Sequence, residues 1–125
     1  MKGTYILKMN LSKNAKINVG SLGKIDFKPG TYFYVGSAFG SGGFKRIKRH
    51  KNVSKGKNKN KHWHIDYLTS SSYLEIVDID KFPKEKVECE LAQKLKGEPV
   101  EKFGCSDCDC RSHLKFINSN TEDYL

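Results

Sequence analysis

The stretch from residue 31 to residue 50, TYFYVGSAFGSGGFKRIKRH, constrains the fold more than any other part of the sequence. Aromatic and β-branched residues alternate at its start, which predicts a strand with Tyr32 and Tyr34 on one face. Residues 36–43 are rich in glycine, and such a segment favours a tight turn after the strand. A helix can begin near Phe44, where apolar and basic residues follow with helical spacing. The order strand, turn, helix predicts a domain in which a basic helix packs on a β-sheet.

Two further segments predict strands of the same sheet. Residues 4–9 alternate in the same way and place Tyr5 and Leu7 on one face. Residues 73–79 predict another strand. Glycine and proline interrupt residues 11–29, which predicts an additional hairpin between the first two strands.

Two more helices are predicted, over HWHIDYL at residues 62–68 and VECELAQKL at residues 87–95, with a lysine- and asparagine-rich loop over residues 51–61. On the last helix Glu88 lies beside the apolar stripe, whereas Glu90 should face water. A carboxylate on the core side of a helix is costly unless it has a partner or binds a ligand. Glu88 could therefore form a structural ion pair with a lysine or arginine, or it could bind a metal ion.

The helix predicted from HWHIDYL carries polar residues whose role the pattern leaves open. His62, His64 and Asp66 could line a groove or join a proton network. Histidines that flank an anchoring aromatic residue, here Trp63, are more often structural. Of the two histidines, we single out His64 as the candidate accessory residue.

Positive charge is concentrated in one segment. The chain carries 23 lysines and arginines against 14 acidic residues, a net charge of +9. Nine of the basic residues and no acidic one lie between Phe44 and Lys61, so the whole excess falls in this segment. Such a concentration favours a site for a polyanion, with a solvated lysine-rich loop as the simpler alternative. The candidate nucleic-acid-binding residues are Lys45, Lys48, Arg49, Lys51, Lys55, Lys57, Lys59 and Lys61.

Composition limits the class of protein. A hydrophobic content of 37% with 30% charged residues suits a soluble globular chain, and 125 residues suit one domain over 1–125. No apolar run approaches the roughly 20 residues that cross a bilayer. We therefore expect a cytoplasmic protein with reduced thiols, no membrane association and no organic cofactor. The oligomeric state is left open.

Three cysteines and a histidine cluster near the end of the sequence. Cys105, Cys108, Cys110 and His113 fall within nine residues and are enough ligands for one zinc ion. Zinc sites usually draw their ligands from two separated segments, however, and so short a span would strain a tetrahedron. We therefore favour a buried structural turn here over a zinc site.

These motifs together resemble the GIY-YIG nuclease superfamily. The resemblance rests on GTY at residues 3–5, YVG at residues 34–36 and KRIKRH ending at His50, followed by a glutamate on a later helix. More narrowly, YVGSA, RH, HWHIDYL, ECELA and SDC resemble an uncharacterised, mostly prokaryotic branch of that superfamily, a domain of unknown function that is sometimes fused to endonuclease III. This resemblance extends over nearly the whole chain.

The resemblance implies an α/β (α+β) fold of GIY-YIG type, with a small central antiparallel sheet of about three strands flanked by helices. An extra hairpin separates the two motif strands here. The resemblance also implies metal-dependent phosphodiester hydrolysis with one Mg²⁺ or Mn²⁺ ion. Carried onto this chain, it assigns Tyr5 and Tyr34 as the motif tyrosines, Arg46 as the catalytic arginine, His50 as the histidine of the basic helix and Glu88 as the metal ligand.

The chemistry of these side chains agrees with that implication. A carboxylate oxygen suits Mg²⁺ or Mn²⁺, and the guanidinium fork of Arg46 suits the charge that develops on phosphoryl oxygens. A tyrosine, with an ordinary pKa of about 10, needs help to act as a base, which His50 could provide. We expect a DNA endonuclease acting in repair or recombination. An inactive nucleic-acid-binding module on the same scaffold, and RNA as the partner, stay open.

Overall fold

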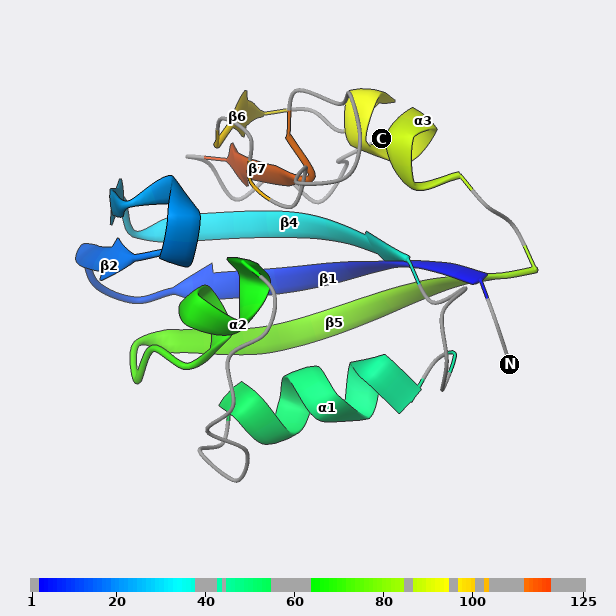
Figure 1. Ribbon diagram of the computed structural model, residues 1–125, viewed down its shortest axis with the longest axis horizontal. Coiled ribbons are helices and arrows are strands. Elements are labelled where there is room, and N and C mark those ends of the chain that lie inside the picture. The colour runs from blue at the N-terminus through cyan, green and yellow to red at the C-terminus, as the bar shows by residue number, and fades with distance from the viewer. Residues whose placement is uncertain are drawn as a thin grey trace.

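An antiparallel sheet of five strands forms the centre of the molecule (Figure 1). The computed structural model describes residues 3–37, 43, 45–54, 64–84, 87–94, 97–100, 103 and 112–117. Within these residues the strands lie side by side in the order β5-β1-β4-β7-β6. Their bounds are β1 (Gly3–Leu11), β4 (Gly30–Ser37), β5 (Leu74–Pro83), β6 (Glu98–Pro99) and β7 (Leu114–Ile117).

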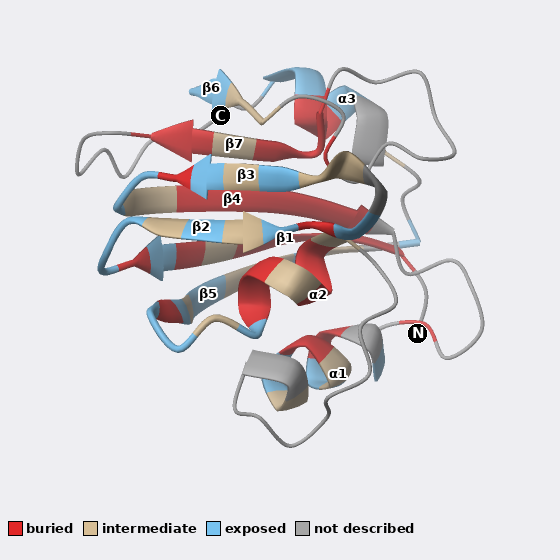
Figure 2. Cartoon of the chain, turned by 60° about the vertical axis from the view of Figure 1, so that its left-hand side comes forward, coloured by how far each residue is buried: buried red, intermediate tan, exposed pale blue. Residues whose placement is uncertain are grey.

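The additional hairpin expected between the first two strands is present. Strands β2 (Ala15–Asn18) and β3 (Lys24–Phe27) pair with each other, and a short 3-10 helix, η1 (Gly20–Leu22), joins them. The hairpin lies over one face of the large sheet, in front of β1 and β4 (Figure 2). It alternates between half-buried residues, such as Ile17 and Ile25, and exposed ones, because one of its faces packs on the core.

Alternation along β1 and β4 divides the core into two layers, as the sequence predicts. Tyr5, Leu7 and Tyr34 contribute to the layer beneath the hairpin and two helices, α1 (Lys45–Ser54) and α2 (His64–Thr69). The intervening residues, Phe33 among them, face the opposite side, where α3 (Glu88–Lys94) packs with Leu91 and Ala92. The expected mixed α and β architecture is therefore confirmed.

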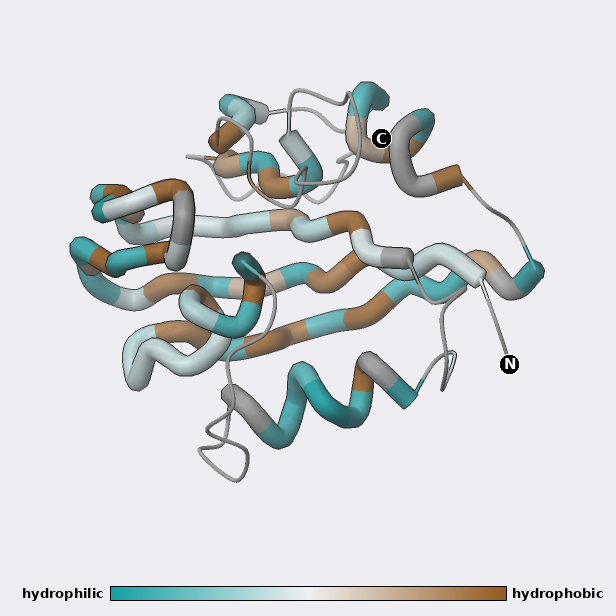
Figure 3. The backbone as a smooth tube through the Cα atoms, in the orientation of Figure 1, coloured by the Kyte–Doolittle hydropathy of each residue, from teal (hydrophilic) through white to brown (hydrophobic). Residues whose placement is uncertain are grey.

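Helix α1 shows why a strongly basic segment can pack on a sheet. Ile47 and His50, three residues apart, are buried, whereas exposed lysines recur at positions 45, 48 and 51. In Figure 3 the coloured part of this helix is hydrophilic apart from one apolar position. Among the described residues no helix is long and apolar enough to cross a membrane.

Some boundaries differ from the sequence prediction. The sheet has two strands more than the three expected, because β7 pairs with the free side of β4 and β6 pairs with β7. The four residues of β7 are too short to carry a recognisable period. The helix α1 continues through Ser54, where a loop was predicted from residue 51, and lysine near a helix C-terminus favours this extension. The rest of that predicted loop, residues 55–61, lies outside the described residues.

Candidate functional site

Strand register brings the two tyrosine motifs together at one end of the sheet. In the antiparallel pairing of β1 with β4, Tyr5 lies opposite Gly36 and Leu7 lies opposite Tyr34. Residues directly opposite each other share a face, so both motif tyrosines face α1 and α2. The start of β1 and the ends of β4 and β5 meet at this end of the sheet (Figure 1).

The glycine of the second motif makes room for the tyrosine of the first. A β-carbon on Gly36 would overlap the ring and hydroxyl of Tyr5. Gly36 is not among the glycines with positive φ, so steric room, and not backbone conformation, explains glycine here. The sequence suggested only that this glycine begins a turn. The structure shows that its missing side chain leaves room for the Tyr5 ring against β4.

His50 of α1 meets the same ring. The Tyr5 hydroxyl lies 2.6 Å from His50 Nε2, and both side chains are buried, with 2% and 1% of their surface exposed. The Tyr34 ring meets the His50 ring edge-on, with centroids 6.4 Å apart. Three of the five residues that the motifs single out as catalytic, Tyr5, Tyr34 and His50, thus lie together.

A buried carboxylate from α2 completes this cluster. Asp66 Oδ1 lies 2.8 Å from Arg49 Nη1 and 3.8 Å from His50 Nδ1. The Asp66 side chain is fully buried, and Arg49 retains 23% exposure. The sequence placed Asp66 among candidates for a proton network, but no local pattern indicated its pairing with Arg49, because 17 residues separate the two.

The start of α3 is attached to the strand that carries Tyr5. The backbone N–H of Val87 donates to Thr4 Oγ1 at 3.1 Å, and Glu88, the first residue of the helix, follows directly. The backbone of Arg46 belongs to α1. The side chains of Glu88 and Arg46 lie outside the described part of the structure. Glu90 is exposed, as predicted.

The candidate nucleic-acid-binding residues differ in exposure. Lys45, Lys48 and Lys51 point to solvent from α1, whereas Arg49 turns toward Asp66. One cation that the sequence did not single out is Lys81, an exposed residue of β5 directly opposite Tyr5 and therefore on the same face. The four remaining candidates lie outside the described residues: Lys55, Lys57, Lys59 and Lys61.

The accessory candidate His64 lies beside the central cluster. Its ring meets that of Phe103, with centroids 5.7 Å apart, and Phe103 in turn contacts Tyr34. Burial lowers the pKa of His64. His64 thus reaches the tyrosine layer through the Phe103 ring, which favours a packing role.

The cysteine cluster is described only at its last residue. His113 is buried, and its backbone donates to the Phe103 carbonyl and accepts from Val35. Among the described residues, no group of three or more histidine, cysteine or acidic side chains could hold a metal ion. The other three candidate zinc ligands, Cys105, Cys108 and Cys110, lie outside them.

Comparison with known proteins adds the family. Residues 4–124 match the family model described as "Domain of unknown function DUF123". The chain belongs to the DUF123 family. No curated protein and no solved structure gives a significant match.

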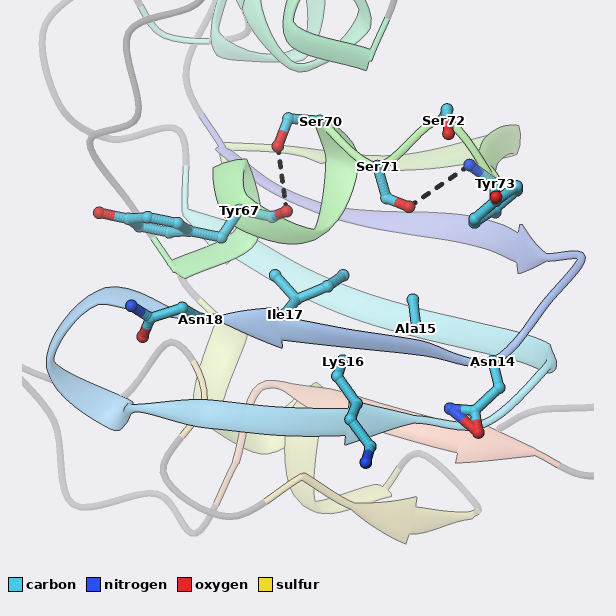
Figure 4. A pocket seen from close by; sticks show the side chains of 10 residues that line it. All are labelled: Asn14, Ala15, Lys16, Ile17, Asn18, Tyr67, Ser70, Ser71, Ser72 and Tyr73. Carbon is cyan, nitrogen blue, oxygen red and sulfur yellow. Dashed lines mark hydrogen bonds between the residues drawn. The ribbon is translucent and has the colours of Figure 1, made fainter.

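The DUF123 chain also has a polar hollow of about 650 Å³ between β2 and the turn that follows α2 (Figure 4). Ser70, Ser71 and Tyr73 contribute to its lining. Tyr73 lies opposite Ser12, at the far end of β1 from Tyr5, about 20 Å along the strand. The hollow is therefore separate from the tyrosine and histidine cluster, and none of the candidate site residues lines it.

Proposed function

We propose that this chain is a metal-dependent endonuclease of GIY-YIG type that hydrolyses DNA phosphodiester bonds, with a role in repair or recombination. The observation that carries the proposal is the 2.6 Å contact between Tyr5 Oη and His50 Nε2, beside Tyr34. These residues come from two strands and a helix that the resemblance pairs in one site. A basic helix surface next to the cluster suits a polyanionic substrate.

Different residues would carry out proton transfer, charge stabilisation and phosphate binding. A tyrosine hydroxyl is a weak base at neutral pH, so a partner must take its proton as it receives one from the attacking water. His50 Nε2 is within hydrogen-bond distance and can accept that proton. Arg46 would stabilise the charge that develops on the phosphoryl oxygens. The exposed lysines of α1 would bind neighbouring phosphates without reading sequence.

Glu88 would hold the metal ion. Magnesium typically takes one or two carboxylates and several waters, so a single glutamate is an adequate protein donor set for Mg²⁺ or Mn²⁺. The hydrogen bond between Val87 and Thr4 fixes the start of α3 at the end of β1 that carries Tyr5. Because α3 packs on the face of the sheet opposite the tyrosines, Glu88 would have to reach the site around this end of the sheet. When bound, the ion supplies positive charge to the phosphate and to the leaving oxygen.

A second candidate function is binding without turnover. The low exposure of Tyr5 and His50, 2% and 1%, favours it, because two side chains buried against each other can serve packing alone. In that case the basic surface of α1 would bind DNA or RNA on a scaffold that does not cleave it.

A cleavage assay separates the two functions. Labelled duplex, flap, branched and single-stranded DNA, and RNA, are incubated with the protein and Mg²⁺, Mn²⁺ or EDTA. We expect cleavage of DNA that requires the metal and falls at least about 100-fold in Glu88→Gln and in Arg46→Gln, with binding retained. Glu90→Gln, an exposed change on the same helix, is the matched control and should cleave like the parent.

Three outcomes would each overturn a different part of this proposal. Binding without cleavage on every substrate would favour the inactive module. Cleavage that persists in EDTA or in Glu88→Gln would refute the metal assignment, and a preference for RNA would replace the substrate.

A further inference from the structure

We infer that Asp66 is a positioning residue for His50: its carboxylate, 3.8 Å from Nδ1 and so beyond direct hydrogen-bond distance, acts through its charge to favour the proton on Nδ1 and leaves Nε2 to accept from Tyr5. The inference rests on the proposed function, because it gives Asp66 a part in that reaction. Asp66 itself is 0% exposed and reaches the reaction only through His50.

The geometry places the histidine ring between an acid and a phenol. Asp66 Oδ1 lies 3.8 Å from Nδ1, on one side of the ring, and Tyr5 Oη lies 2.6 Å from Nε2, on the other side. All three side chains are buried, so water does not screen the carboxylate from the ring. Three separate elements, α2, α1 and β1, thus contribute one aligned set of polar groups.

The position of the carboxylate selects one tautomer. A neutral imidazole carries its proton on one nitrogen and a lone pair on the other. A negative oxygen near Nδ1 favours the proton there, as in sites where a carboxylate orients a histidine. Nε2 then presents its lone pair to the Tyr5 hydroxyl. The opposite tautomer would turn a lone pair toward Asp66 and remove the acceptor that Tyr5 needs.

The proton steps balance in this arrangement. As water attacks the phosphate, its oxygen bonds to phosphorus and the bond from phosphorus to the leaving oxygen breaks. One water proton moves to the Tyr5 oxygen, and the Tyr5 proton moves to His50 Nε2. The leaving oxygen takes a proton from solvent, to which His50 later returns its own. The O–H bond of tyrosine breaks, an N–H bond forms, and the ring becomes an imidazolium with both nitrogens protonated. Asp66 stays ionised and stabilises that cation.

Arg49 explains why such a carboxylate can stay buried. Asp66 Oδ1 accepts from Arg49 Nη1 at 2.8 Å, so the acid is paired in the resting state. The same ion pair also links α1 to α2. A merely structural role for Asp66 would need this link alone, so the test must read the state of the histidine ring.

Ring nitrogens of His50 can be observed directly in the full-length protein without substrate. Long-range ¹H–¹⁵N correlation spectra report which nitrogen carries the proton. We expect the Nδ1–H tautomer in the parent and in Arg49→Lys, which keeps the carboxylate with a positive charge beside it. In Asp66→Leu the preference should be lost. Because that variant leaves the partly buried Arg49 without its acid, Arg49→Met/Asp66→Leu removes the whole pair and protects the fold.

Kinetics complete the test. Against the Arg49→Lys reference, the double variant should lose about 10- to 100-fold in kcat, whereas a change in KM for DNA would report the loss of the charge at position 49. A folded double variant that keeps the Nδ1–H tautomer, or that cleaves as fast as the reference, would overturn the positioning role. A parent protein that cleaves nothing would defeat the proposed nuclease instead, while the ring spectra would still decide whether Asp66 orients His50.

Discussion

At the scale of single residues, the contact between Tyr5 and Gly36 is the most specific packing feature of the site. A methyl group on Gly36 would overlap the Tyr5 ring, and the two residues lie directly opposite each other on neighbouring strands. Overpacking of this kind typically costs about 1–3 kcal/mol. We expect Gly36→Ala to lower the free energy of unfolding by that amount, measured by urea denaturation, and to separate Tyr5 from His50.

A double-mutant cycle isolates the cause. In a Tyr5→Ala background the ring is gone, so Gly36→Ala should then cost little or nothing. If Gly36→Ala lowered the free energy of unfolding equally in the parent and in Tyr5→Ala, glycine would be needed here for another reason. The same cycle measures how strongly the second motif supports the first.

At the scale of elements, α2 contributes to the free energy of unfolding by an amount that depends on pH and can be measured. Burial lowers the pKa of His64, the first residue of α2, so the folded state favours the neutral ring. Its stability contribution is complete above the ordinary value of about 6.5 and falls as the pH drops through the lowered value, because the unfolded chain then binds more protons. We expect His64→Phe to lose less unfolding free energy than the parent between pH 7.5 and pH 5. Parallel losses in the two proteins would contradict this.

The same scale shows how far the sequence could predict the fold. Period-two alternation correctly assigned Tyr5 and Leu7 to one face of β1, and Tyr32 and Tyr34 to one face of β4 with Phe33 on the other. That the two tyrosine faces coincide follows from the strand register, which the sequence did not indicate. Strand β7 was missed, because its four residues gain their place through pairing with β4. Such pairing is a long-range property that a short apolar run does not indicate.

The candidate site likewise combines residues that local sequence patterns indicate with contacts that only the tertiary structure shows. Arg46 and His50 follow from local spacing on one helix, and the strand positions of the two tyrosines follow from local alternation. The pairing of Arg49 with Asp66 joins two helices and has no local signature. Sequence patterns therefore indicated which side chains could do the chemistry, whereas tertiary structure was needed to show which of them orient the others.

At the scale of the whole molecule, the decisive property is the distribution of charge. The excess of basic residues falls in one segment of the sequence, and the structure turns three of its lysines, Lys45, Lys48 and Lys51, toward solvent from one helix. Other exposed lysines lie on the hairpin and its flank, at positions 16, 24 and 28, over a different part of the molecule. The two groups carry equal charge, so they distinguish a local binding surface from a general effect of net charge.

Salt dependence measures this difference. Binding of duplex DNA releases about 0.9 counterions per phosphate contacted, so each lost contact reduces the slope of log K against log salt by about that amount. We expect glutamine at positions 45, 48 and 51 to weaken binding. The slope of log K against log salt should become shallower by the amount that corresponds to the loss of up to about three phosphate contacts. Glutamine at positions 16, 24 and 28 changes the net charge equally but should leave the slope near that of the parent. Equal effects from the two triple variants would mean that DNA senses the overall charge of the protein and that α1 is not its binding surface.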